Sequence, residues 1–459
     1  MPLKSKKELS QEAVTLATSF SLVRYNQVTY IPVDFETGDW RVTPDPERTS
    51  WIPLNKQELQ IVAKEQFDTL FYNEAERMAF DFMVAQFAYQ YNGRVNSLLV
   101  KTASGLKELR PDGKLHEPTG AFIPNTLKPI LNEDPDDKAF VMSVLTDWVD
   151  AEEEAVAMLR HFATALAPGW SAVKYVLLMG DGRNGKSLMM EMLVRIFGRE
   201  NCSHVSRQDI SDKSPVVTEL NGKLLNLVFD GQADYLKDSG LEKSLVAGEV
   251  GGIRRLYQSE LTPVQTNALF VEGLNTEPKS KDKTSALQAR LVRFWFPKVF
   301  DEDSAFKKKL LSEKYVGALL ALLIDNYVQE DERAVMLAPT ALSKELQLEH
   351  MFDNSLAMQF IKHVDETDPL GADSLIGMDF SELIDLFRSW RVKENDLSSW
   401  PEPTVFGYFR PVLSTERRSK RVNGQPRKAR VISAFKKDTV AFLATMREED
   451  AHATAVVHE

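Results

Sequence analysis

The segment Gly180–Ser187 constrains this chain more than any other stretch of its sequence. It reads Gly-Asp-Gly-Arg-Asn-Gly-Lys-Ser, follows the apolar run Tyr175–Met179 and leads into Leu188–Phe197, which has a helical pattern. A strand, a glycine-rich turn ending in Gly-Lys-Ser, and a helix form the phosphate-binding P-loop. Glycines at 180, 182 and 185 let backbone N–H groups approach phosphates, and the positive helix end favours the same anion.

The chemistry of this motif assigns roles to single residues. Lys186 reaches the β- and γ-phosphates of a nucleotide, and the Ser187 hydroxyl ligates Mg²⁺. The nucleotide-binding set comprises Gly180, Gly182, Asn184, Gly185, Lys186 and Ser187. A P-loop predicts a bound nucleoside triphosphate and Mg²⁺, but it does not say what the hydrolysis serves.

Composition sets broader limits. A chain of 459 residues with 43% hydrophobic residues is long enough for two or three globular domains. Cys202 is the only cysteine, which excludes an internal disulfide and a cysteine zinc cluster. The net charge of −11 argues against a wholly basic nucleic-acid coat, but a local basic patch would be enough for binding. With no membrane span or signal peptide in sight, we expect a cytoplasmic protein, in the host cytoplasm if a phage encodes it.

Three further strands are expected after the P-loop helix. Leu224–Phe229 ends in Asp230, and an acid at the end of a buried strand is where P-loop NTPases hold Mg²⁺. Asn267–Leu274 ends at Asn275, whose amide either orients the attacking water or caps the turn before Pro278. The segment 289–296 is expected to be a strand with Arg290 at its start.

The segments around this core are less specific. Val28–Val33 and Val95–Lys101 are predicted strands, and Lys56–Tyr91 is mainly helical in pattern. The acid-rich stretch 133–160 favours a solvated helix face over a metal site, with Asp136 and Asp137 at a helix N-terminus. A turn at 251–252 precedes the short expected strand Ile253–Tyr257, which carries Arg254 and Arg255.

The order of these features resembles the superfamily III helicases, and in particular the phage, plasmid and poxvirus branch found in primase-helicase proteins. The likeness covers residues 175–300 and rests on five blocks: GDGRNGKS at 180–187, GKLLNLVFD at 222–230, KSLVAGEVGGIRRLY at 243–257, LFVEGLNTEP at 269–278 and ARLVRFWFP at 289–297. Asn184 before Gly-Lys-Ser is a more telling feature than the bare P-loop.

The resemblance implies a compact AAA-like α/β ATPase that works as a ring, expected to be a hexamer. It implies that Lys186, Ser187 and Asp230 bind MgATP, that Asn275 senses the γ-phosphate and that Arg290 is an arginine finger for the neighbouring subunit. Members of this family move along single-stranded DNA with a hairpin, which here falls within 253–268. Arg254, Arg255 and Tyr257 are therefore candidates for strand contacts, although Arg254 fits a structural ion pair equally well.

One departure from the family pattern concerns the water-activating group. The family usually ends the strand before the metal site in glutamate, often with a second acid nearby, whereas this chain has Asp230-Gly231-Gln232 and then Asp234. Gln232 and Asp234 are both candidates for positioning the attacking water. A weak or inactive ATPase is the alternative.

The C-terminal part predicts a second kind of DNA contact. Lys314–Tyr327, Ser355–Val364, Phe380–Trp390 and Thr404–Leu413 have helical patterns. Asn423-Gly424 between two basic runs predicts a β-hairpin. Helices followed by such a hairpin suggest a winged-helix module. Residues 417–437 hold nine Lys/Arg and no acid, which either marks a phosphate-backbone binder or is a solvated charge run. The candidate DNA contacts are Arg417, Arg418, Lys420, Arg421, Arg427, Lys428 and Arg430.

Together these features divide the chain into four expected parts. They are a mixed α+β accessory or assembly domain (1–132), the ATPase with its helical lead-in and lid (133–345), a winged-helix-like DNA-binding domain (346–440), and a C-terminal helix end with a disordered tail (441–459). The leading hypothesis is an ATP-dependent replicative helicase of a phage or mobile element, acting on single-stranded and forked DNA with a separate primase or another replication partner. The alternatives are a nucleotide-regulated origin-binding or regulatory DNA-binding protein without unwinding activity, and a motor on protein or duplex DNA.

Overall fold

The computed structural model describes two compact units of the chain. One unit comprises residues 1–278 and 289–340, and the other comprises residues 279–288 and 341–459. The residues described are 6–25, 28–34, 37, 48–54, 61–65, 74–91, 95–119, 121–232, 236, 238–254, 261–278, 285–353, 355–394, 400–410, 412–422, 425–437, 439–440 and 442–444.

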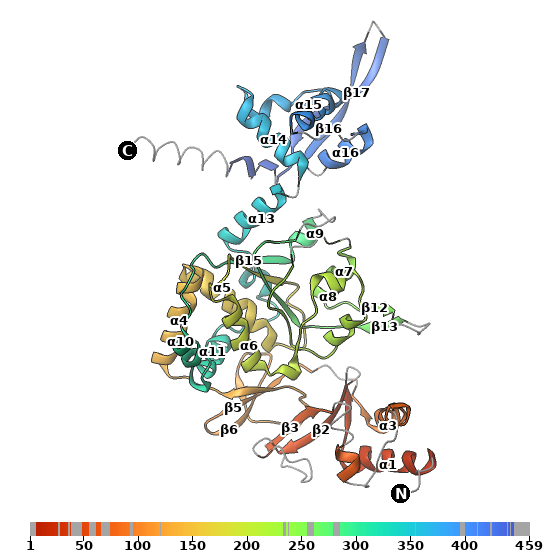
Figure 1. The fold of residues 1–459 in the computed structure, drawn as a ribbon, viewed down its shortest axis with the longest axis vertical. Helices are drawn as coiled ribbons and strands as arrows, with labels where there is room; N and C mark the ends of the chain where they lie inside the picture. Colours follow the sequence, from red (N-terminus) through yellow and green to blue (C-terminus); the bar gives the residue numbers. More distant parts are fainter. Residues whose placement is uncertain are drawn as a thin grey trace. The chain divides into compact units, whose positions relative to one another are not determined.

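The first unit begins with a small sheet covered by two helices. Its strands lie in the order β3-β2-β1-β4, and α1 packs against α3 (Figure 1). The elements are α1 (Lys6–Ser19), β1 (Val23–Tyr25), β2 (Val28–Asp34), β3 (Thr49–Pro53), α3 (Glu74–Phe87) and β4 (Tyr89–Gln90). The strand at Val28–Val33 is confirmed. The predicted helix Lys56–Tyr91 is wrong at its end, because Tyr89 and Gln90 pair with β1 instead.

A second sheet, in the order β7-β6-β5-β8, connects these elements to the larger core. Its strands are β5 (Leu98–Thr102), β6 (Gly105–Leu109), β7 (Leu115–His116) and β8 (Thr126–Ile130). Leu98, Val100, Leu109 and Leu127 belong to the same apolar cluster as the central helices. The Ser50 and Thr126 hydroxyls are hydrogen-bonded at 2.8 Å, which joins β3 to β8.

The core of the first unit is a five-stranded sheet in which every neighbouring pair is parallel, in the order β10-β11-β14-β9-β15. Its strands are β9 (Tyr175–Met179), β10 (Cys202–Ser203), β11 (Leu225–Val228), β14 (Leu269–Leu274) and β15 (Leu291–Trp295). All residues of β9, β11 and β14 are buried, as expected for a parallel sheet covered on both faces. The three strands predicted after the P-loop helix are therefore confirmed, and β14 lies between β9 and β11.

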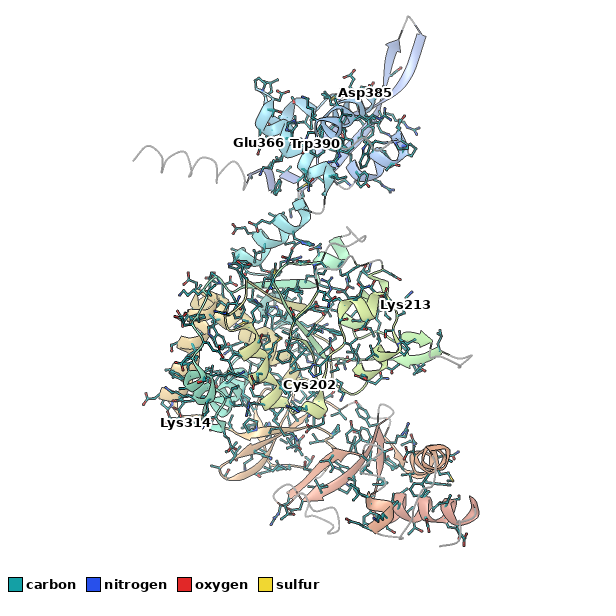
Figure 2. All side chains as sticks on the ribbon, viewed as in Figure 1. Cys202, Lys213, Lys314, Glu366, Asp385 and Trp390 are labelled. Carbon is teal, nitrogen blue, oxygen red and sulfur yellow. The ribbon has the colours of Figure 1, made fainter. Side chains whose placement is uncertain are left out.

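Helices cover both faces of this sheet, and Figure 1 shows α4, α5, α6 and α11 on one side with α7 and α8 on the other. The elements are α4 (Pro135–Val149), α5 (Glu152–Ala163), η2 (Thr164–Leu166), α6 (Lys186–Phe197), η3 (Arg199–Asn201), α7 (Arg207–Ser211), η4 (Pro215–Leu220), α8 (Gly240–Val246), α10 (Ser304–Leu310), α11 (Glu313–Asp325) and α12 (Arg333–Met336). Asp134 caps α4 by accepting from the Asp136 and Asp137 N–H groups, so the helix start predicted there is confirmed. Cys202 is buried in this unit (Figure 2).

A short antiparallel hairpin follows α8. It consists of β12 (Gly251–Arg254) and β13 (Leu261–Val264), with Arg254 opposite Leu261. The predicted hairpin is thus confirmed in position, but the turn predicted at 251–252 is wrong, because Gly251 and Gly252 belong to β12 and pair with Val264 and Pro263. Residues 255–260 lie outside the described part of the chain, and with them Arg255 and Tyr257.

The second unit is a helical cluster with a long hairpin. Its elements are α9 (Ser285–Gln288), α13 (Ala341–Asp353), α14 (Leu356–Thr367), η5 (Gly371–Leu375), α15 (Phe380–Lys393), α16 (Glu402–Phe409), β16 (Leu413–Val422) and β17 (Gln425–Phe435). Phe360, Phe387 and Phe409 form its aromatic core, with Trp390 beside them (Figure 2). The helix predicted over Thr404–Leu413 ends earlier, at Phe409, because Leu413 pairs with Phe435 in the hairpin.

The strands of the second unit's hairpin pair up to the residues on either side of the predicted turn. Val422 pairs with Gln425, and the predicted Asn423-Gly424 turn itself lies outside the described residues. The hairpin also meets the backbone before α15: Asp379 forms a bridge with Val431, and the Ile432 N–H donates to the Met378 carbonyl at 3.0 Å. Among the described residues, no helix is long and apolar enough to cross a membrane.

Candidate active site

The loop between β9 and α6 has the backbone that its glycines predict. Gly180, Gly182 and Gly185 have φ values of +149°, +100° and +97°, which side-chain-bearing residues rarely adopt. A Cβ at Gly180 would also overlap the Asn184 amide, and one at Gly185 would overlap the Trp148 indole. Glycine is therefore required at 180 and 185 for packing as well as for conformation.

Hydrogen bonds hold the P-loop lysine and asparagine within the loop. The Lys186 ammonium donates to the Gly180 carbonyl and, at 3.1 Å, to the Asn184 Oδ1. The Asn184 amide in turn donates to the Phe296 carbonyl at 3.3 Å. Burial lowers the pKa of Lys186, while the carboxylates of Asp181 and Asp230 act in the opposite direction. Asn184, a residue on which the family resemblance partly rests, thus ties the lysine to the end of β15.

One cavity at the carboxyl edge of the sheet brings together the predicted nucleotide-binding and catalytic residues other than Gly180 and Arg290. Lys186, Ser187, Asp230 and Asn275 all line it, and its volume is about 1120 Å³. Two backbone bonds align the loops that carry them: Gly180 N–H donates to the Leu274 carbonyl at 3.2 Å, and Gly231 N–H to the Gly273 carbonyl at 2.8 Å. Because β14 separates β9 from β11, Asn275 emerges between the lysine loop and Asp230. Polar groups at the carboxyl ends of parallel strands are the usual place for a ligand in such folds.

The opposite wall of this cavity was not predicted. It is formed by α4, which contributes Val144 and Trp148, and by the segment after β15, which contributes Phe300 and Phe306. The Phe300 N–H donates to the Arg183 carbonyl at 2.8 Å, which fixes this segment to the loop. Lys298 bridges Asp147 of α4 and Asp150, the residue directly after α4, at 3.0 and 2.7 Å. An apolar wall beside a phosphate loop suits the base of a nucleotide. Neither segment carries a motif, so no local pattern predicts this wall.

The cavity also holds oxygen donors suited to a divalent cation. The Ser187 hydroxyl and the Asp230 carboxylate belong to exposed residues of the same cavity, and hydroxyl and carboxylate oxygens are ligands that Mg²⁺ prefers. The donor set therefore fits the ion that the P-loop motif implies.

A buried acid lies directly behind Asp230. Any Cβ at Gly231 would overlap the Glu272 carboxylate, so that only glycine fits between Asp230 and Gln232. Tyr175 donates its hydroxyl to Glu272 at 3.2 Å, and burial raises the Glu272 pKa to about 7. Glu272 does not line the cavity. Of the two candidates for positioning water, Gln232 is exposed, and Asp234 lies outside the described residues.

The buried acid belongs to an ionic cluster on the α7–α8 face of the sheet. Arg207 of α7 makes two bonds to Glu242 of α8, at 2.8 and 3.4 Å, and its guanidinium lies 5.5 Å from the centre of the Tyr175 ring. Arg293 of β15 forms a second buried pair with Glu277, at 2.8 and 3.0 Å. Arg293 is therefore a structural residue of the strand that Arg290 precedes.

Arg290 lies at the other edge of the sheet. Its carbonyl accepts from the Tyr175 N–H at 2.7 Å, at the amino end of β9. Five residue steps separate Tyr175 from Gly180, which is about 16 Å along a strand. Arg290 is half-buried and stands near Lys174, whose pKa is lowered by burial and by the Arg290 charge. The structure thus does not bring Arg290 into the cavity of its own chain.

The predicted DNA contacts lie on two hairpins. Arg254 is the last residue of β12, and its side chain is not described. On the long hairpin Arg417 pairs with Arg430, and Lys420 with Arg427, so positive residues stand directly opposite one another. Arg417 and Arg418 are exposed, and Arg430 places its guanidinium 4.0 Å from the centre of the Phe406 ring. For Lys420, Arg421, Arg427 and Lys428 only the backbone is described.

Comparison with known proteins gives a match in structure but none in sequence. No protein-family profile matches the chain, and no curated protein matches it. A solved structure titled "The A form apo structure of NrS-1 C terminal region-CTR" matches with a TM-score of 0.50 and 15% identity, over 92% of this chain and 98% of that one. Two other structures of the NrS-1 C-terminal region match at 0.46, with 15% and 13% identity. The first likeness shows a shared mixed α/β fold over most of the chain.

Proposed function

We propose that this protein is an ATP-dependent DNA helicase with an AAA-like P-loop core, acting in the replication of a phage or mobile element. The observation that carries the proposal is the shared cavity of Lys186, Ser187, Asp230 and Asn275 at the carboxyl edge of a parallel sheet. These residues come from three separate segments, and only the fold brings them together. Their arrangement supports binding and hydrolysis of a nucleoside triphosphate.

Each residue of the cavity has a distinct task in this proposal. The backbone of the glycine loop and the Lys186 ammonium hold the phosphates and balance their charge. Ser187 and Asp230 hold the Mg²⁺, which supplies further neutralisation of phosphate charge when bound. The Asn275 amide orients the γ-phosphate or the attacking water. Val144, Trp148, Phe300 and Phe306 contact the base.

Hydrolysis would depend on assembly of a ring, which we propose to be a hexamer. Arg290 lies about 16 Å along the sheet from its own phosphate loop. An arginine at this edge is suited to stabilise the transition-state charge in the cavity of a neighbouring subunit. The proposal therefore assigns Arg290 the role of an arginine finger that acts in trans.

Two hairpins would contact DNA. The β12–β13 hairpin is proposed to contact the single strand through Arg254, the last residue of β12, and through Arg255 and Tyr257, which follow it in the sequence. The second unit is proposed to be a winged-helix module, supported by the order α14, α15, α16, hairpin and by the bridge between Asp379 and Val431. Its basic hairpin would contact phosphates, because directly opposed positive residues destabilise a hairpin unless an anion compensates them.

The test is ATP hydrolysis with and without single-stranded DNA, on protein sized by mass photometry, followed by unwinding of a forked duplex. We expect DNA-stimulated hydrolysis in a ring-sized species and strand displacement that requires ATP. A monomer or dimer that hydrolyses ATP at the same rate with and without DNA would contradict the proposal.

A second candidate function is a nucleotide-regulated DNA-binding protein without unwinding activity. The observation in its favour is the Asp230-Gly231-Gln232 sequence, because Gly231 has no room for a second acid beside Asp230. Duplex binding that changes with ATP, with negligible turnover and no strand displacement, would support this function over the helicase.

A further inference from the structure

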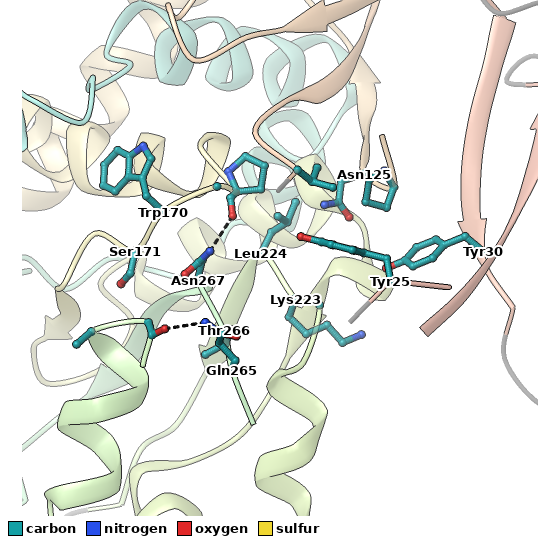
Figure 3. Close-up of a pocket in the computed structure, with 17 residues that line it drawn as sticks. Tyr25, Tyr30, Asn125, Trp170, Ser171, Lys223, Leu224, Gln265, Thr266 and Asn267 are labelled. Carbon is teal, nitrogen blue, oxygen red and sulfur yellow. Dashed lines mark hydrogen bonds between the residues drawn. The ribbon is translucent and has the colours of Figure 1, made fainter. Parts of the chain in front are cut away.

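A second cavity lies in the first unit at the amino ends of β11 and β14, away from the phosphate loop. Its volume is about 410 Å³, within the range of small-molecule sites. Tyr25 and Tyr30 form one side, Asn125 lies above them, and the turns before β11 and β14 form the floor (Figure 3). None of the functions proposed above uses this cavity.

The lining of this cavity is planar and almost uncharged. Figure 3 shows two tyrosine rings and the amides of Asn125, Gln265 and Asn267 around it. Lys223 is the one cation among the lining residues, and none of them is a carboxylate. Aromatic faces with planar amides are the groups that proteins use to stack on nucleobases and to bond their edges. The Lys223 ammonium donates to the Glu200 carbonyl at 2.6 Å. Because an ammonium has three N–H donors, it can also serve the phosphate that accompanies a base.

The rings are held in place before any ligand arrives. Tyr25 contacts Tyr91 and Phe122 edge-on, with centroids 5.8 and 5.9 Å apart, and Tyr30 contacts Phe122 at 5.4 Å. Tyr30 is buried, whereas Tyr25 is half-buried. Tyr25 thus offers ring surface whose rotamer is already restricted, which lowers the entropy lost on stacking.

One polar atom in the lining lacks a partner. Asn125 is only 5% exposed, and its Oδ1 has no hydrogen-bond partner within the described part of the chain. The other two amides are engaged: Asn267 donates to the Pro168 carbonyl at 3.1 Å and Gln265 to the Gly248 carbonyl at 3.3 Å (Figure 3). A buried acceptor without a donor destabilises a fold. Asn125 is part of the cavity lining, so a turn of its side chain toward a bound ligand would give the Oδ1 the donor that it lacks. The exocyclic amines and ring N–H groups of nucleobases are donors of this kind.

The cavity is continuous with the base of the β12–β13 hairpin. Gly248 precedes that hairpin and Gln265 follows it, and the bond between them closes its two ends. Asn221, next to the lining turn, accepts from the Gln265 N–H at 3.0 Å and donates to the Pro263 carbonyl at 3.3 Å. A base bound here would contact the residues from which the hairpin projects.

We infer that this cavity is a nucleobase-binding site, separate from the ATP site, and that its occupant is a base of the single-stranded DNA on which the protein acts. The claim that the cavity binds a nucleobase rests on Tyr25, Asn125 and Lys223. The claim that this base belongs to single-stranded DNA rests on the proposed helicase function.

The experiment uses the full chain with Lys186→Ala, so that nucleotide does not bind at the phosphate loop. An oligothymidylate carrying one 2-aminopurine, and free 2-aminopurine deoxyriboside monophosphate, serve as separate probes, because stacking on an aromatic ring quenches 2-aminopurine fluorescence. We expect the fluorescence of the 2-aminopurine oligonucleotide to be quenched when it binds the protein. In Asn125→Leu its affinity should fall by about tenfold or more, because the bond to the Asn125 Oδ1 is removed. Tyr25→Leu should abolish the quenching, whereas Tyr25→Phe should retain it.

Two features keep this test decisive. Asn125→Leu removes an unpartnered buried acceptor at similar volume, so its melting temperature should rise even as binding is lost. Tyr89→Leu changes a tyrosine that is 68% exposed and does not line the cavity, and it should bind as the parent does.

Parent-like quenching in both Asn125→Leu and Tyr25→Leu would overturn the inference. Equal affinity for the free nucleotide and for the oligonucleotide would keep the base site but overturn the single strand as the source of the base. DNA-independent hydrolysis by the protein with Lys186 intact would overturn the helicase function alone.

Discussion

The indole of Trp148 lies against Gly185, the residue before the P-loop lysine. A Cβ at Gly185 would lie 2.6 to 2.8 Å from three indole atoms, whereas one at Gly182 would have no atom within 4 Å. Both glycines have φ near +100°. A side chain at Gly182 would therefore cause backbone strain alone, whereas one at Gly185 would cause backbone strain and a steric overlap with Trp148.

Gly182→Ala and Gly185→Ala should weaken ATP binding to different extents. Left-handed backbone with a Cβ costs about 1–2 kcal/mol, or roughly tenfold in affinity, and this applies to both variants. Displacing Trp148 adds about 1–3 kcal/mol in Gly185→Ala alone. Titration with a fluorescent ATP analogue measures the difference. Equal losses in the two variants would contradict the contact between α4 and the loop.

The sequence was sufficient to predict the residues at the ends of the strands. Apolar runs whose length and composition indicate buried strands come before Lys186, Asp230 and Asn275. Because the carboxyl ends of parallel strands lie at one edge of a sheet, the three residues are expected to lie together there, and all three line the cavity. The wall formed by Trp148 and Phe300 could not be predicted in this way, because its segments meet the loop only through tertiary packing.

Other features were missed because local patterns do not encode long-range partners. Tyr89 continues a helical pattern, but it pairs with β1. Leu413 follows a predicted helix, but its backbone pairs with Phe435. Glu272 lies in a run that reads as a fully apolar strand apart from this one acid, and the fold supplies Tyr175 as its partner. The placement of Arg290 at the far edge likewise required the strand register.

Lys186→Ala should abolish ATP turnover without unfolding the protein. The ammonium supplies charge to the phosphates as the transition state forms, and loss of one such donor lowers kcat by about 10²–10³-fold. Lys213→Ala is a suitable control, because Lys213 is exposed and pairs with Asp238 at 3.0 Å, and neither residue lines the cavity. Turnover by Lys186→Ala at the control's rate would refute the site.

Arg290→Ala should abolish hydrolysis yet leave nucleotide affinity unchanged. Arg290 stands at the amino edge of the sheet, so that its loss does not alter the cavity of its own chain. Mixed rings of Arg290→Ala and Lys186→Ala subunits should regain part of the activity, because some interfaces then combine an intact loop with an intact arginine. Steady-state phosphate release across mixing ratios measures this. No recovery in mixed rings of verified composition would exclude action in trans.

His161 should make the first unit sensitive to acid. It is fully buried in α5, its Nδ1 contacts the Ala157 carbonyl at 2.8 Å, and burial lowers its pKa to about 4. Between pH 6.5 and 4 the unfolded chain binds a proton here that the folded chain does not. Stability is therefore lost as pH falls through this range, by up to about 3 kcal/mol.

Calorimetry of the full chain and of His161→Leu at pH 7.5, 6.5 and 4.5 checks this titration. The variant should lose less stability than the parent between pH 6.5 and 4.5, whereas the two proteins should differ little in the stability that they lose between pH 7.5 and 6.5. Identical pH profiles for the two proteins would show that His161 does not set the acid limit.

Arg417→Gln should stabilise the long hairpin while weakening DNA binding. Arg417 stands directly opposite Arg430, and opposed like charges destabilise a strand pair by about 0.2–1 kcal/mol. If Arg417 contacts a phosphate, its loss should also reduce the slope of log affinity against log salt by about 1. Lys362→Gln is a control on α14, where Lys362 pairs with Glu366 at 3.7 Å. DNA titrations at several salt concentrations measure the slope. A parent-like slope with raised thermal stability would assign the charge run to solvent rather than to DNA.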